Sequence, residues 1–141
     1  MIVCIDTNAL LPVLGTRHPY GVILDAFIDG AFTWAVSNEI MAEYEEVVGP
    51  RIGARRWEDF IRLIEGVGGL RQNLKRVSPT FRFDLISDDV DDNKFADCAI
   101  VAEADFIITD DRHFAAMANS GYKPQPISPA KFIEQCLSGQ E

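Results

Sequence analysis

Carboxylates follow two of the apolar runs in this sequence. Asp6 comes directly after the β-branched run Ile2–Ile5, and Asp110 and Asp111 come directly after the run at 106–109. If the two runs are neighbouring parallel strands, their carboxyl ends meet at one edge of the sheet, where ligands bind in open α/β sheets. Aspartate is also a common turn former and helix cap, so each position alone has a purely structural explanation.

Helical phase adds two more acids. In the helix predicted over 37–48, Glu43 lies at the margin of the apolar face, where an uncompensated carboxylate costs desolvation energy. In the helix predicted over 91–104, Asp92 lies at the N-terminal end of the apolar face, whereas Asp97 is expected on the opposite, solvated face. Structural roles stay open here too, with Glu43 as a border residue and Asp92 as a helix cap.

Four carboxylates that converge on one crevice repel one another unless a cation neutralises them. They are Asp6, Glu43, Asp92 and Asp111. Oxygen ligands are hard donors that suit Mg²⁺ or Mn²⁺ better than zinc. His18 and His113 have no metal-site spacing and are expected at the surface. The chain contains neither a glycine-rich phosphate loop nor a GxSxG nucleophile elbow, so the acids favour metal-assisted attack on a phosphate ester.

The elements that would position these acids alternate along the chain. Strands are predicted at residues 2–5, 32–36, 74–77, 106–109 and 126–127, and helices at 8–14, 20–29, 37–48, 54–65 and 91–104, near 113 and after 128. Gly49-Pro50 is predicted to end the third helix, and the glycines at 66, 68 and 69 the fourth. This alternation predicts an α/β fold: a three-layer sandwich with a central, mainly parallel sheet of four or five strands flanked by helices.

Length and composition predict one domain over residues 1–141, since 141 residues with 48% hydrophobic content suffice for a single core. The apolar runs are too short to span a membrane, and the start of the chain lacks the basic and long apolar regions of a signal peptide. The three cysteines form no CxxC motif, which favours reduced thiols and a cytoplasmic location over a disulfide or a zinc site.

The charges are unevenly distributed. The net charge of −9 argues on average against a polyanionic partner, yet eight basic residues lie between 51 and 82 and ten acids between 84 and 111. In the helix predicted over 54–65, Arg55 and Arg62 share the face opposite Trp57 and Phe60. That face is either a phosphate-binding surface or an ordinary solvated one.

In order and spacing, these motifs resemble a PIN domain. The matching segments are Asp6-Thr7-Asn8 after the first strand, Ser37 and Glu43 in their helix, Asp91-Asp92-x-Lys94-Phe95 opening a helix, and Ile108-Thr109-x-Asp111 after a late strand. The resemblance covers about residues 2–127 and extends to the bacterial and archaeal branch of VapC-like toxins of type II toxin–antitoxin systems. Asp110 stands where a small or polar residue is commoner in the family, which leaves the last ligand role open between Asp110 and Asp111.

The resemblance implies a ribonuclease that depends on one or two Mg²⁺ or Mn²⁺ ions. It assigns the metal and the catalysis to Asp6, Glu43, Asp92 and Asp111, with Asp110 as an additional candidate ligand, and phosphate-positioning roles to Thr7, Asn8 and Thr109. RNA would contact Arg51, Arg55 and Arg62. A cognate antitoxin protein and a second copy of the chain are the expected protein partners, and no membrane is expected.

Two other functions stay open. A PIN-like module without catalysis would act through protein contacts alone, although uncompensated carboxylates would then cost stability for no purpose. A phosphotransfer protein is the other alternative. A haloacid-dehalogenase phosphatase needs Asp-x-Asp after its first strand, where this chain has Asp6-Thr7-Asn8, and the acidic pair of a receiver domain is not clear.

Overall fold

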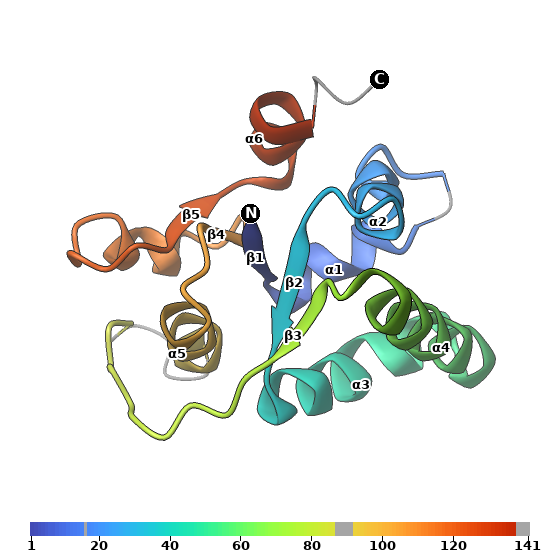
Figure 1. Cartoon of the computed structure of the whole chain (residues 1–141), viewed down its shortest axis with the longest axis horizontal. Helices are drawn as coiled ribbons and strands as arrows, with labels where there is room; N and C mark the ends of the chain where they lie inside the picture. Colours follow the sequence, from blue (N-terminus) through green and yellow to red (C-terminus); the bar gives the residue numbers. More distant parts are fainter. Residues whose placement is uncertain (16, 87–91, 138–141) are drawn as a thin grey trace.

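The computed structural model describes residues 1–15, 17–86 and 92–137, and five strands in it form one parallel sheet (Figure 1). The strands are β1 (Ile2–Ile5), β2 (Thr33–Val36), β3 (Leu74–Arg76), β4 (Phe106–Ile108) and β5 (Gln125–Ile127). Their order in the sheet is β3-β2-β1-β4-β5, and each pair of neighbours runs parallel. This arrangement confirms the predicted α/β fold with a central parallel sheet.

Helices cover both faces of the sheet. They are α1 (Thr7–Val13), α2 (Gly21–Ile28), α3 (Asn38–Ile52), α4 (Ala54–Arg71), α5 (Asn93–Val101), the 3₁₀ helix η2 (Arg112–Met117) and α6 (Pro129–Phe132), which continues into the π-helical turn η3 (Ile133–Leu137). Figure 1 shows α3 and α4 on one side of the strands and α5 on the other. Within the described ranges, no helix is both long and apolar enough to cross a membrane.

The core fills the space between the sheet and both helical layers. Trp34 of β2 packs edge-on against Phe27 of α2 and lies against Tyr44 of α3. On the α5 side, Phe95 contacts Phe114 of η2, and all five of these rings are fully buried. The three cysteines are free: Cys4 and Cys98 are buried with their Sγ atoms 3.8 Å apart, and Cys136 is half-buried.

Two helices extend past their predicted ends. The α3 helix includes Gly49 and Pro50 and ends at Gly53, whose φ of 93° no longer fits a helix. A Cβ at Gly49 would lie 3.9 Å from the Trp57 ring of α4, an ordinary van der Waals distance, so the contact between the two helices does not require a glycine. Because the helix continues to Ile52, the prediction that Gly49-Pro50 ends it is wrong.

The α4 helix runs through three glycines that were predicted to end it. Gly68 lies against Leu74 of β3 so closely that a Cβ there would be 2.6 Å from the Cβ of Leu74. The helix ends instead at Gln72, which adopts the left-handed conformation of a C-cap at φ 57°. The glycine at 68 therefore allows the close approach of β3 and is not a stop signal.

Candidate metal centre

The carboxyl ends of β1 and β4 are adjacent at one edge of the sheet. Ile5 pairs with Ile108, and the Asp6 N–H donates to the Ile108 carbonyl at 3.0 Å. The Thr109 hydroxyl donates to Asp6 Oδ2 at 2.9 Å and accepts from the Asp111 N–H, also at 2.9 Å. Thr109 therefore connects two acids that lie about a hundred residues apart in the sequence and were predicted at this edge.

Asp6 is the most deeply buried of these acids, with 3% of its surface exposed. Burial raises the pKa of its carboxyl to about 6. The Thr109 hydrogen bond opposes this increase in pKa, whereas the nearby charges of Asp111 and Glu43 add to it. Asp6 is therefore a carboxylate that a proton or a cation would stabilise.

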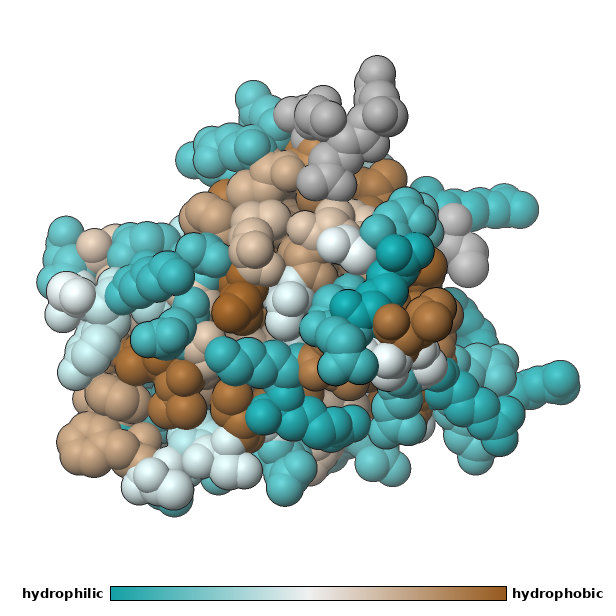
Figure 2. Space-filling view, viewed as in Figure 1, coloured by the Kyte–Doolittle hydropathy of each residue, from teal (hydrophilic) through white to brown (hydrophobic). Residues whose placement is uncertain are grey.

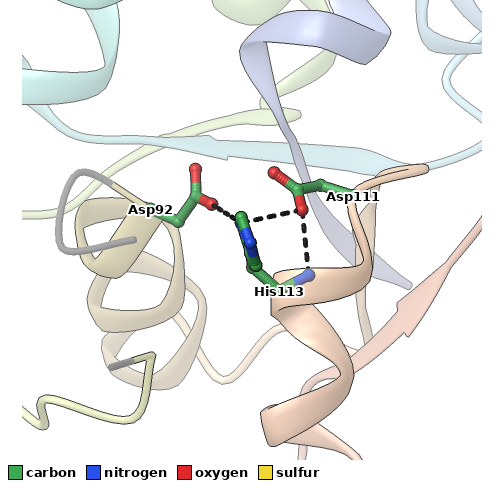
Figure 3. Close-up of side chains that lie close together, drawn as sticks. All are labelled: Asp92, Asp111 and His113. Carbon is green, nitrogen blue, oxygen red and sulfur yellow. Dashed lines mark hydrogen bonds and ion pairs between the residues drawn. The ribbon is translucent and has the colours of Figure 1, made fainter. Parts of the chain in front are cut away.

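Asp92, Asp111 and His113 come together beside this edge (Figure 3). The Nδ1 atom of His113 lies 3.1 Å from Asp111 Oδ1 and 3.7 Å from Asp92 Oδ2. One ligand atom from each of the three residues lies within 4.8 Å of the others, a spacing that allows them to share one metal ion. Asp111 also caps η2 by accepting from the His113 N–H at 2.9 Å.

His113 corrects the expectation of a surface histidine. Its side chain is 30% exposed and contacts two of the predicted site acids. The cause is local. Asp111 caps the 3₁₀ helix η2, and this turn brings the His113 side chain back beside the Asp111 carboxylate. The sequence signal for this contact was an Asp-x-His motif directly after a strand. It was missed because His113 has no other histidine or cysteine at the usual metal-site spacing.

Glu43 reaches the site from α3, which begins at the Ser37 N-cap. One carboxylate oxygen pairs with Lys94 Nζ of α5 at 2.6 Å, and the other accepts a hydrogen bond from the Thr7 hydroxyl. Both members of the ion pair are about one-fifth exposed. A part of the negative charge at this edge is therefore already balanced by a lysine of the protein.

Thr109 links Asp6 to Asp111, His113 contacts Asp111 and Asp92, and Glu43 is near enough to Asp6 to raise its pKa. We call Asp6, Glu43, Asp92 and Asp111 the acid cluster. Among the described residues, Asp92 and Asp111 share the spacing of one metal ion with His113, whereas Asp6 and Glu43 lie outside that group. A family model described as PIN domain matches residues 2–113. The chain belongs to the PIN domain family. The match spans all four acids and ends at His113. No curated protein and no solved structure matches the chain.

PIN domains are generally nucleases, and the donor set of this PIN domain fits a divalent cation. Asp92 and Asp111 offer carboxylate oxygens, the ligands that Mg²⁺ and Mn²⁺ prefer. His113 adds an imidazole that contacts both carboxylates, an arrangement common for residues that orient metal ligands. The buried carboxyl of Asp6, whose pKa is raised to about 6 by burial, would also be stabilised by a nearby cation.

The remaining predicted polar positions divide into two groups. Thr7 and Thr109 are buried and hydrogen-bonded to members of the acid cluster. Asn8 and Asp110 are exposed at the same edge of this PIN domain. Asp91, which was also part of the predicted motif, lies outside the described residues.

Asp97 of α5 is not on a solvated face, contrary to prediction. It is 9% exposed, its Oδ1 accepts from the Phe83 N–H at 3.1 Å, and burial raises its pKa. The segment that follows β3 folds over this face of α5, which no helical phase could reveal. Asp97 is therefore unsuitable as an exposed control for substitutions at Asp92.

The predicted RNA-binding arginines lie away from the acid cluster. Arg51 is in the last turn of α3, eight residues beyond Glu43, or about 12 Å along the helix axis. Arg55 and Arg62 are exposed on α4. The structure places all three on the hairpin formed by α3 and α4, so they would contact a nucleic acid only beyond the immediate metal site.

Proposed function

We propose that this PIN domain is a Mg²⁺- or Mn²⁺-dependent endoribonuclease and the toxin of a type II toxin–antitoxin system. The group of Asp92, Asp111 and His113, with Asp6 linked to Asp111 through Thr109, supports the nuclease assignment best. The proposed metal ligands and catalytic residues are Asp6, Glu43, Asp92 and Asp111, with Asp110 as an additional ligand. When bound, one or two ions would supply a polarised water and neutralise charge at the phosphate.

The residues of the chain prepare this site in distinct ways. Thr109 fixes the orientation of Asp6 through its hydroxyl and links it to Asp111. Thr7 and Lys94 hold the two oxygens of Glu43. Thr7, Asn8 and Thr109 are proposed to position the phosphate or the ligands around it, and His113 to orient Asp92 and Asp111.

A strongly acidic protein can bind RNA once cations reverse the local charge at the site. We assign backbone contacts to Arg51, Arg55 and Arg62, which are exposed on the α3–α4 hairpin. For single-stranded RNA, each lost phosphate contact reduces the slope of log affinity against log salt by roughly 0.7. Arg55→Glu with Arg62→Glu should therefore lower this slope, and an unchanged slope would assign both arginines to an ordinary solvated face.

A cleavage assay on structured and unstructured RNA tests the nuclease assignment. Cleavage should require Mg²⁺ or Mn²⁺, stop in EDTA, and be lost in Asp6→Asn and Asp92→Asn. Asp59→Asn, on the exposed surface of α4, is the matched control and should cleave like the wild type. Cleavage that survives EDTA or Asp92→Asn contradicts the assigned site, and absence of Mn²⁺ binding in calorimetry favours a non-catalytic module.

The toxin role rests on the resemblance to VapC-like proteins. It implies a cytoplasmic protein that is inhibited by a cognate antitoxin and forms a homodimer, with the whole chain 1–141 as one domain. Expression of the wild type should arrest growth, and Asp6→Asn should relieve the arrest. Harmless expression of a protein that cleaves RNA in vitro would refute the toxin role while leaving the nuclease assignment intact.

A further inference from the structure

A cavity of about 470 Å³ lies beside the acid cluster. Its walls are the start of α3, the segment 77–84 that follows β3, and the first turns of α5. Lys94 belongs to both places, because it lines the cavity and pairs with Glu43. The volume falls within the range of about 300–1,000 Å³ that is usual for small-ligand sites.

Three aromatic rings lie next to one another beside this cavity, and one of them, Phe81, lines it. Phe81 is 64% exposed, and its ring centroid lies 4.9 Å from that of Phe83. Phe83 in turn lies 5.2 Å from Tyr122, which is 40% exposed. We call Phe81, Phe83 and Tyr122 the aromatic cluster. Figure 2 shows apolar side chains at the surface in this part of the molecule, at the lower left.

The segment that carries Phe81 and Phe83 is fixed to the helix of the acid cluster. The Phe83 N–H donates to Asp97, and the Ile86 backbone exchanges two hydrogen bonds of 2.9 Å with the Asn93 side chain. Asn93 directly follows Asp92 in the sequence. The aromatic cluster therefore has a defined position relative to the candidate metal centre.

The charged and polar side chains that line the cavity indicate which class of ligand it suits. Arg82 and Lys94 are the cationic residues of its lining, and Lys94 also pairs with Glu43. The same walls carry the Asn38 amide and three carboxylates, Glu39, Asp84 and Asp97, which can accept hydrogen bonds from the amino groups of a base edge. Aromatic rings next to cations are typical of sites for unpaired bases, and such polar walls suit a base edge better than an apolar protein surface.

We propose that this cavity binds one unpaired base of the RNA substrate close to the scissile phosphate, with Phe81 stacking on the base and Arg82 contacting the adjoining phosphate. The proposal rests on the proposed nuclease function and adds a recognition site to it. It makes Phe81 a specificity-determining residue, since a base in a duplex is not available for stacking.

Fluorescence titration with single-stranded RNA that carries 2-aminopurine at successive positions tests the proposal. The Asp6→Asn protein is used so that the RNA stays intact. We expect quenching at one position, and about tenfold weaker binding with loss of that quenching when Phe81→Ala is added, the effect of losing one stack. Phe81→Trp should retain both signals, and Leu70→Ala, a control that is 83% exposed on α4, should change neither. Circular dichroism verifies that each variant is folded.

The outcomes separate this proposal from the nuclease assignment. Metal-dependent cleavage with unchanged RNA affinity and quenching in Phe81→Ala refutes the base site alone. Quenching that depends on Phe81 in a protein that never cleaves RNA refutes the nuclease assignment alone. Self-association that Phe81→Ala abolishes, with no effect on RNA, assigns the aromatic cluster to a protein interface and refutes the base site.

Discussion

Replacing Asp6 by asparagine should stabilise the metal-free protein above about pH 6. Asp6 is 3% exposed and faces the negative charges of Asp111 and Glu43, and burial raises its pKa to about 6. The ionised carboxylate therefore opposes folding unless a cation is bound. The Asp6→Asn substitution would keep the shape of the side chain and an oxygen that accepts from Thr109, but it removes the charge.

The pH dependence has a definite sign. The carboxyl has its ordinary pKa of 3.8 in the unfolded chain and about 6 in the folded one, so the folded state binds more protons between these values. The stabilisation from the protonated carboxyl is fully present below about pH 4 and is lost as the pH rises through 6. The difference between the two pKa values corresponds to about 3 kcal/mol, an upper bound on what Asp6→Asn can recover.

Thermal unfolding followed by circular dichroism in EDTA measures this effect. At pH 8, Asp6→Asn should be more stable than the wild type by about 1–3 kcal/mol, or roughly 3–10 °C in melting temperature. At pH 4 the two proteins should melt together. Exposed Asp59→Asn should match the wild type at both pH values. A destabilised Asp6→Asn at pH 8, or an equal gain at both pH values, would refute the electrostatic reasoning.

Two further predictions concern the candidate metal centre, and a third concerns Asp105, an acid outside it. Mn²⁺ at a hundred times its dissociation constant should stabilise the wild type by roughly 2.7 kcal/mol and Asp92→Asn by far less; equal stabilisation would remove Asp92 from the site. His113→Ala should weaken Mn²⁺ binding in calorimetry roughly 10- to 100-fold, and an unchanged affinity would make its contacts incidental. The pKa of Asp105 is lowered by hydrogen bonding from the Ile2 N–H and by Lys123. Asp105→Asn should therefore destabilise the protein in urea unfolding at pH 7, and this loss should shrink below pH 3.8; a constant loss would contradict the assignment.

The acids at strand ends were predictable because the period and direction of strands are local properties. To predict that Asp6 and Asp111 lie together, it was enough to recognise two apolar runs as neighbouring parallel strands, whose carboxyl ends lie at the same edge of the sheet. The positions of Glu43 and Asp92 beside the apolar faces of their helices followed from the helical phase alone. The pairing of Glu43 with Lys94 was beyond such reasoning, because it depends on how α3 and α5 approach each other across the site.

Other features depended on tertiary contacts and could not be predicted locally. Asp97 is buried because the segment after β3 crosses its helix face and donates the Phe83 N–H. Gly49 and Gly68 carry the ordinary signal for helix ends, yet both lie inside helices, and Gly68 marks the place where Leu74 of β3 approaches closely. The rule that glycine ends a helix fails at Gly68, because the sequence alone does not distinguish a glycine needed for a turn from one needed for close packing against a neighbouring strand.

The pairing of β1 with β4 also determines when the site can form during folding. The hydrogen bond from Thr109 to Asp6 joins residues 103 positions apart, so Asp6 has no completed surroundings until the late strand has been synthesised. A growing or truncated chain that ends before β4 leaves one edge of β1 unpaired, and such an edge invites pairing with other chains. The carboxylates of the acid cluster would then not be brought together, and incomplete chains would be aggregation-prone.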